Sequence, residues 1–347
     1  MGFLTRSDPK SGPSVASSPE GLERHALDCA PALPTNKDPP DETTGTDQNQ
    51  WEGWNACTFA LRLERCIDAD VRSAYEVRVV ASLDLGAYLE RIGWSGETPV
   101  TLETLTWLIR AHMSSIPFEN LDVLLGRPVR LDLESVQDKL VRGRRGGYCF
   151  EHAILFAAAI ERLGFKSTRH SARVVPFFPR TETPRTHMFL TVSLPQGRFV
   201  VDPGFGGAAA QFAIPLVDGR EESPHEASHW MSKDGPYWWM RTQTADGASD
   251  VWVSTLEEDY PIDFEMANHY TASHPRSPFV NRLMVSVFKP DGRVTLMNRD
   301  LTIRRGATVH KSQLADRTAL RNLLIEHFGF DLPEVERLRV PATPEWN

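Results

Sequence analysis

Apolar side chains recur at helical spacing in the segment that begins at residue 83. Leu85, Tyr88, Leu89 and Ile92 occupy positions i, i+3, i+4 and i+7, which is the pattern of an amphipathic helix, and Gly93 is a suitable end for it. Further helices are expected over residues 101–116 and 132–141. Thr101 and Asp132 stand at their starts, where a short polar side chain caps free backbone N–H groups.

Residues 149–163 are apolar on nearly all sides, so we expect a buried helix there. The pattern then changes to short alternating runs bounded by Gly, Pro and Asp turns, which is typical of antiparallel strands. A closing helix is expected over residues 312–327. Helices followed by strands predict an α+β fold. The expected strands cover residues 169–175, 187–194, 198–202, 237–242, 250–255, 282–288 and 293–303.

The first 82 residues differ from the rest of the chain. They are rich in Ser, Pro, Thr, Asp and Gly, and such a segment buries too little apolar surface to offset its chain entropy. We therefore expect a largely disordered extension. Whether it is translated, or reflects a start codon assigned too far upstream, is left open; N-terminal sequencing of the native protein would decide.

Charge and composition exclude several classes of protein. The 347 residues carry a net charge of −8, and the extension holds 13 acidic and 8 basic side chains against 33 and 30 in the remainder. The charge therefore belongs mostly to the extension. The negative net charge argues against a general nucleic-acid binder or a polybasic membrane binder. No apolar run is long enough for a membrane span, and the first residues lack a signal-peptide core.

The four cysteines fit a reducing compartment. Cys29, Cys57 and Cys66 lie in the extension and Cys149 stands alone, and this spacing suggests neither a disulfide framework nor zinc knuckles. We therefore expect a cytoplasmic protein with no metal site, although Cys149 and His152 have zinc-like spacing.

Cys149 is the strongest candidate for chemistry. It follows a Gly-Gly turn in G-R-R-G-G-Y-C-F-E-H and begins the buried helix. Free N–H groups and the positive end of the helix dipole stabilise a thiolate at such a position. The alternative, a small buried cysteine that only packs, is the commoner fate of a lone cysteine. It requires no glycine turn, however, so the functional interpretation is favoured.

A reactive cysteine needs a base and a group that orients the base. His187 begins one expected strand and Asp202 ends the next, with a P-Q-G turn between them. Taken alone, His187 could be a surface residue and Asp202 a turn residue. If Leu194 faces Arg198, then Asp202 falls about 10 Å along the strand from His187. A bulge or a different turn would have to correct that register.

Several separated motifs together resemble the arylamine N-acetyltransferase family, in its bacterial form. They are R-G-G-Y-C-F-E-H, T-H-M and V-D-P-G-F-G-G, with further matches at residues 115–122, 126–132 and 277–283. The resemblance runs from about Leu83 to the C-terminus. It implies a core similar to those of cysteine proteases and transglutaminases. In that arrangement residues 83–165 form a helical bundle with the nucleophile, 166–275 a β-barrel and 276–347 an α/β lid.

The resemblance also implies roles for individual residues. Cys149 would be the acetyl-accepting nucleophile, His187 its base and Asp202 the orienting carboxylate. The other implied positions are Arg145 and Glu151 as supports of the site, Phe118 and Phe205 in the acceptor pocket, and Gly206 and Gly207 beside coenzyme A. The family pattern is broken at Ala153, where asparagine is usual, and by the extension.

The expected reaction is ping-pong transfer of an acetyl group from acetyl-CoA to an arylamine or arylhydrazine, through an acetyl-cysteine. Acetyl-CoA would be a co-substrate, with no tightly bound cofactor and neither nucleic acid nor membrane as partner. Three alternatives stay open: an amide synthase of polyketide macrolactam biosynthesis with the same triad, a cysteine hydrolase and a non-catalytic scaffold. G-F-G-G at 204–207 fits either a coenzyme A contact or a plain turn. A tryptophan cluster is expected in the core, made of Trp230, Trp238, Trp239 and Trp252.

Overall fold

The computed structural model describes residues 82–346, except 177, 220–227, 245–246 and the side chain of Thr244. All described residues belong to one compact unit. The expected extension, with Cys29, Cys57 and Cys66, lies outside the described residues apart from Ser82. No helix in the described part of the chain is long and apolar enough to span a membrane.

The helices of the first part form where the apolar spacing predicts them, except α5, which the pattern did not indicate. The Thr101 side chain accepts a hydrogen bond from Thr104 N at 3.2 Å, and Asp132 accepts one from Ser135 N at 2.9 Å, so both predicted N-caps are confirmed. A π-helical turn, Asp138–Arg142, continues the second of these helices. The helices are α3 (Leu85–Arg91), α4 (Leu102–Ser115), α5 (Leu121–Leu124), α6 (Leu133–Gln137) and α7 (Cys149–Arg162).

A seven-stranded antiparallel sheet follows, in the order β5-β4-β3-β2-β8-β7-β6. Its two edges approach each other, because Gly219 N, just beyond β5, donates to Met231 O of β6 at 2.8 Å. The sheet is therefore a nearly closed barrel. Its strands are β2 (Lys166–Val174), β3 (Arg185–Leu194), β4 (Gly197–Val201), β5 (Ile214–Pro215), β6 (His229–Asp234), β7 (Tyr237–Thr244) and β8 (Gly247–Ser254).

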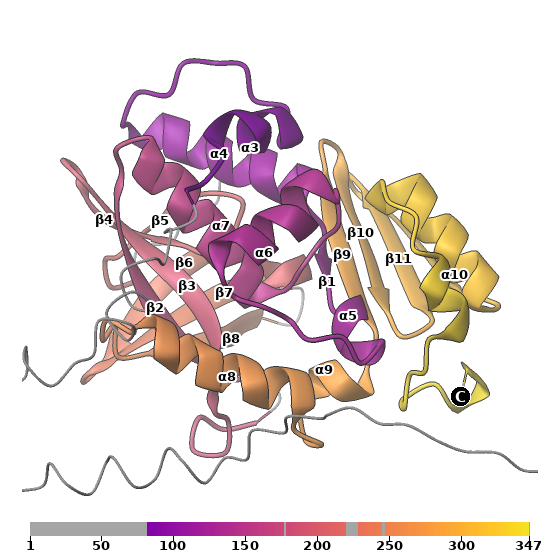
Figure 1. The fold of residues 1–347 in the computed structure, drawn as a ribbon. Helices are drawn as coiled ribbons and strands as arrows, with labels where there is room; N and C mark the ends of the chain where they lie inside the picture. The colour runs from indigo at the N-terminus through magenta and orange to yellow at the C-terminus, as the bar shows by residue number, and fades with distance from the viewer. Residues whose placement is uncertain (1–81, 177, 220–227, 245–246, 347) are drawn as a thin grey trace, which may run out of the picture. The chain divides into compact units, whose positions relative to one another are not determined.

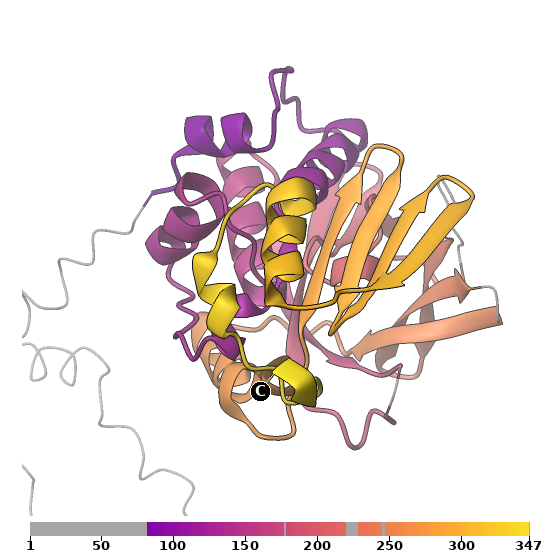
Figure 2. The same cartoon turned by 90° about the vertical axis from the view of Figure 1, so that its right-hand side faces the viewer.

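A second antiparallel sheet of five strands has the order β1-β9-β10-β11-β12. Helix α7 packs on β3 of the first sheet and α4 on β9 of the second, so each sheet contacts one of these helices, and α10 covers the second sheet (Figures 1 and 2). The elements are β1 (Phe118–Glu119), α8 (Pro261–Ser273), α9 (Pro278–Asn281), β9 (Met284–Lys289), β10 (Gly292–Met297), β11 (Asp300–Arg305), β12 (Thr308–Gln313) and α10 (Arg317–Leu323).

The α+β fold class is confirmed, but two local expectations were wrong or incomplete. The run 293–303 is two strands, because Asn298, at φ 55°, turns the chain back between Met297 and Asp300. The expected helix over 312–327 begins only at Arg317, since Asp316 caps it and residues 308–313 pair with β11. The pattern did not indicate β6 or α8.

Candidate active site

Two glycines allow the loop before Cys149 to pass close to the rest of the protein. A Cβ on Gly146 would lie 2.2 Å from Pro117 O, and one on Gly147 would lie 2.6 Å from the Glu151 carboxylate. Gly147 N donates to Pro117 O at 3.1 Å. The loop is thereby attached to β1. It delivers Cys149, which is 3% exposed, to the first position of α7.

Gly204 brings the Asp202 segment against the same cysteine. A Cβ on Gly204 would lie 2.7 Å from Cys149 Cα and 2.9 Å from Cys149 O. Backbone atoms can approach this closely only because residue 204 has no side chain. The glycine after Pro203 is thus required for the packing of the two segments as well as for a turn.

The side chains of His187 and Asp202 meet across neighbouring strands. His187 Nε2 lies 2.8 Å from Asp202 Oδ2, and the two residues are 3% exposed each. The hairpin between β3 and β4 has a two-residue turn that pairs Leu194 with Gly197. The register is therefore shifted by one residue from a pairing of Leu194 with Arg198. Continued past Val201, it places Asp202 opposite Phe189, on the same face as His187. A different turn therefore corrects the register.

His187 is held in its protonated form by its neighbours. Burial lowers the pKa of His187, but the charge and hydrogen bond of Asp202, with a hydrogen bond and charge from Cys149, outweigh burial and raise it to about 10. Cys149 Sγ also lies 3.7 Å from Thr186 O. A sulfur beside an imidazole that a carboxylate orients is an arrangement suited to a thiolate–imidazolium pair.

Trp252 also belongs to this site, although the sequence indicated only that it would lie in the core. Its indole Nε1 donates to Asp202 Oδ2 at 2.9 Å, so that oxygen has two partners, whereas buried Oδ1 has none among the described residues. Trp252 is fully buried and stacks on Phe189 at 4.2 Å. The core expectation is confirmed for Trp252; Trp230, Trp238 and Trp239 are only half-buried. Only the pairing of β8 with β2 reveals its contact with Asp202.

Arg145 and Glu151 belong to a buried ionic network behind the cysteine loop. Glu151 Oε2 accepts from Tyr148 N at 3.0 Å, which caps α7, and its other oxygen accepts from Lys139 Nζ at 2.8 Å. Lys139 also pairs with Asp122 at 2.8 Å, and Arg145 with Glu119 at 2.6 Å. Burial raises the pKa of Glu151, while Lys139 opposes that shift. These contacts fix the position of the loop that precedes Cys149, but none of them involves Cys149 Sγ.

The remaining predicted positions divide into two groups. Phe205 packs edge-on against the His187 ring at 5.1 Å, and Phe118 stacks on His152 at 6.4 Å. Gly206 lies against the Phe118 ring, and Gly207 O accepts a hydrogen bond from Arg293 of β10. The two phenylalanines therefore adjoin the candidate triad or its helix, whereas Gly207 faces the second sheet.

A chain of buried hydrogen bonds connects α7 to α4 and α3. His152 Nε2 lies 3.1 Å from Pro117 O, and because a carbonyl only accepts, this nitrogen carries the proton. His152 Nδ1 then accepts from His112 Nε2 at 2.9 Å, and His112 Nδ1 accepts from the Tyr88 hydroxyl at 3.0 Å. Ala153 is fully buried beside this chain.

The buried histidines should make the folded protein less stable at acid pH. Burial lowers the pKa of His152 to about 4. Between the ordinary value of 6.5 and about 4, the unfolded chain therefore binds more protons than the folded one. The shift of His152 alone should lower the free energy of unfolding by about 3 kcal/mol as pH falls through that window. Burial also lowers the pKa of His112, which adds to the decline. Urea denaturation at several pH values measures it.

The matched pair for that experiment is His152→Gln and His310→Gln, since His310 is exposed on β12. The first variant should lose a large part of the decline below pH 6.5, and the second should keep it. An unchanged pH dependence in His152→Gln would contradict the assignment.

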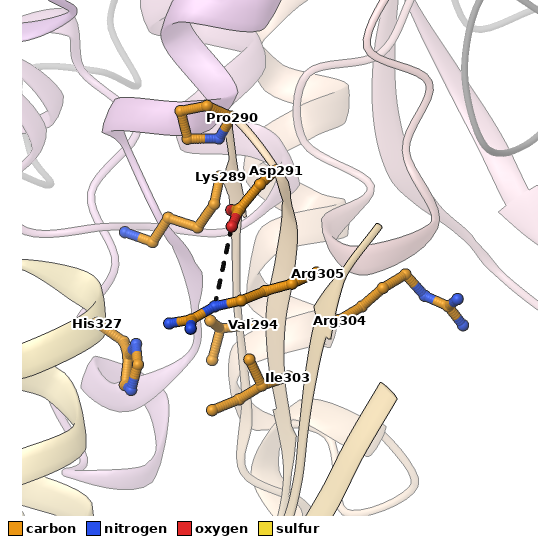
Figure 3. A pocket seen from close by; sticks show the side chains of 8 residues that line it. All are labelled: Lys289, Pro290, Asp291, Val294, Ile303, Arg304, Arg305 and His327. Carbon is orange, nitrogen blue, oxygen red and sulfur yellow. Dashed lines mark ion pairs between the residues drawn. The ribbon is translucent and has the colours of Figure 1, made fainter. Parts of the chain in front are cut away.

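A small cavity of about 170 Å³ lies on the second sheet, away from these residues (Figure 3). Lys289, Arg305 and His327 contribute to its wall, with Asp291 3.9 Å from Arg305. Neither Cys149, His187 nor Asp202 lines it.

Comparison with known proteins identifies the relatives of this chain. The family model described as N-acetyltransferase matches residues 101–337. The arylamine N-acetyltransferase of Mycobacterium tuberculosis is 36% identical over 261 residues, which cover 73% of this chain and 92% of that protein.

Solved structures agree with that result. The arylamine N-acetyltransferase structure from M. tuberculosis matches with a TM-score of 0.69 and 36% identity, covering 73% of this chain and 96% of that one. The Mycobacterium marinum arylamine N-acetyltransferase in complex with CoA matches with a TM-score of 0.69 and 34% identity, over 73% and 94% of the two chains.

Proposed function

Because the chain belongs to the arylamine N-acetyltransferase family and is an acyltransferase, we propose that it transfers acetyl groups through a Cys149–His187–Asp202 triad. The observation that carries this proposal is the buried His187–Asp202 contact of 2.8 Å beside the Cys149 sulfur. Arg145 and Glu151 are proposed as supports of the loop that presents the cysteine.

In the first half-reaction the Cys149 thiolate attacks the carbonyl carbon of acetyl-CoA. The new S–C bond forms while the thioester C–S bond of the donor breaks, and coenzyme A leaves as a thiolate that takes a proton from His187. Backbone N–H groups near Cys149 would donate hydrogen bonds to the oxygen that becomes negative. Such donors contribute about 3–4 kcal/mol each in other enzymes.

In the second half-reaction the arylamine nitrogen attacks the acetyl-cysteine carbonyl. The N–C bond forms, the S–C bond breaks, His187 takes the proton of the amine and the Cys149 thiolate is restored. Arylamines are weakly basic and therefore uncharged at neutral pH, so they can enter an apolar pocket. We propose Phe118 and Phe205 as its walls, arylhydrazines as further acceptors, and Gly206 and Gly207 as neighbours of coenzyme A.

The proposed core is similar to that of cysteine proteases, with residues 83–165 as the helical bundle, 166–275 as the barrel and 276–347 as an α/β lid. In support, α7 carries the cysteine, while β3 and the residue after β4 carry the other two triad members. In this arrangement the nucleophile and its base come from different layers, and packing of α7 on β3 brings them together.

Intact-protein mass spectrometry after mixing with acetyl-CoA tests the proposal. We expect one added acetyl group, located on Cys149 by peptide mapping, which disappears when an arylamine is added and acetylated arylamine forms. Rapid loss of the adduct to water without amine would favour a hydrolase. No adduct with acetyl-CoA would contradict the proposed donor and favour an amide synthase that uses another acyl group.

A further inference from the structure

A second cavity, of about 350 Å³, opens at the ends of β2, β3, β7 and β8. Three arginines come together in its wall: Arg173 from β2, Arg185 from the start of β3 and Arg180 from the segment between them. Hydroxyl groups complete much of the lining, contributed by Ser171, Thr181, Tyr237, Ser254 and Thr255.

This cavity lies on the opposite face of the barrel sheet from the triad. Ala172 pairs with His187 and shares its face. Because side chains alternate along β2, Ser171 and Arg173 point to the other face, and a register shift in β3 pairs Arg173 with Arg185. Arg185 Nε donates to Ser171 Oγ at 2.9 Å, which places its guanidinium on that face too. The cavity is therefore separate from the candidate active site.

The positive charge of the cavity is only partly balanced. Arg185 lies 3.2 Å from Asp259 and 3.5 Å from Glu257, whose side chain is 70% exposed. Among the described residues, no carboxylate lies within ion-pair distance of Arg173 or Arg180. Arg173 donates to Thr183 O, and Arg180 lies over the Tyr237 ring at 4.1 Å. Burial, together with the positive charges of Arg185 and Arg180, lowers the pKa of Arg173.

A compact anion with several oxygens would balance this charge. Guanidinium groups match phosphate oxygens with paired hydrogen bonds, and hydroxyl groups donate further ones. A cavity of about 350 Å³ is larger than one phosphate group and leaves room for the group that carries it. We propose that this cavity binds a phosphate group, free or carried by a small molecule, between Arg173, Arg180 and Arg185. The proposal does not depend on the reaction at Cys149.

Isothermal titration calorimetry of the full chain with pyrophosphate tests the site, at low ionic strength. We expect saturable binding by the unchanged protein. Replacement of one arginine removes charge-assisted hydrogen bonds, so Arg173→Gln should weaken binding by roughly tenfold or more. Arg180→Gln should do the same. Arg180 donates no hydrogen bond to the chain among the described residues, so this variant keeps the test valid if Arg173→Gln fails to fold.

The matched control is Arg305→Gln, which removes an arginine from the other basic cavity (Figure 3). It should leave the pyrophosphate affinity unchanged. Absence of binding, equal binding by all variants, or a loss confined to Arg305→Gln would overturn the proposal. Competition then identifies the source of the phosphate: displacement of pyrophosphate by coenzyme A indicates a carried phosphate, and displacement by inorganic phosphate but not by coenzyme A indicates a free one.

Discussion

Replacing Cys149 by serine is expected to lower the rate of acetyl transfer from acetyl-CoA to an arylamine by about 10³-fold or more. His187, whose pKa is raised to about 10, adjoins the proposed nucleophile, and a serine hydroxyl is a much weaker nucleophile than a thiol. Serine is close to cysteine in volume, so the packing of α7 should be retained. Steady-state rates at saturating acetyl-CoA measure the loss.

Cys66→Ser is the matched control, because it makes the same chemical change in the segment before residue 82. It should keep the full rate and the acetyl adduct, whereas Cys149→Ser should lose both. Acetyl transfer at an undiminished rate by Cys149→Ser would show that another group accepts the acetyl.

Asp202→Asn is expected to lower the turnover number by roughly 10³–10⁴-fold, by analogy with the loss of the carboxylate in serine protease triads. Asp202 Oδ2 accepts from both His187 and Trp252, and its negative charge is the largest influence that raises the pKa of His187. An amide supplies no charge. The imidazolium form of His187 should therefore be lost at a lower pH, which a pH–rate profile would detect.

Trp252→Phe provides the comparison for Asp202→Asn. It removes one hydrogen bond to Oδ2 but keeps the carboxylate and an aromatic ring against Phe189. A single hydrogen bond to a charged group contributes about 1.5–3 kcal/mol, so we expect a loss of roughly tenfold to a hundredfold. If Asp202→Asn retained both the full turnover number and the pH profile, the carboxylate would have no part in the reaction.

Local chemistry made much of the site predictable. A cysteine after two glycines at a helix start has few structural explanations, and a histidine and an aspartate at strand ends are suitable partners. The helix caps at Thr101 and Asp132 are likewise local, since each needs only a backbone N–H within three residues. The strand boundaries were less predictable, because a two-residue turn at Asn298 leaves little trace in the apolar pattern.

The sequence by itself determined the candidate nucleophile, its helix and the change from helices to strands after that helix, because these depend on neighbouring residues. Only the tertiary structure decided how the strands pair. A shift of one residue in the β3–β4 register would move Asp202 to the wrong face, and the turn that prevents it is set by the packing of the whole sheet. Trp252 belongs to the same class, because its partner Asp202 is distant in sequence. The three arginines of the second cavity are close in sequence, but they meet Val253 and Ser254 of β8 only where β8 pairs with β2.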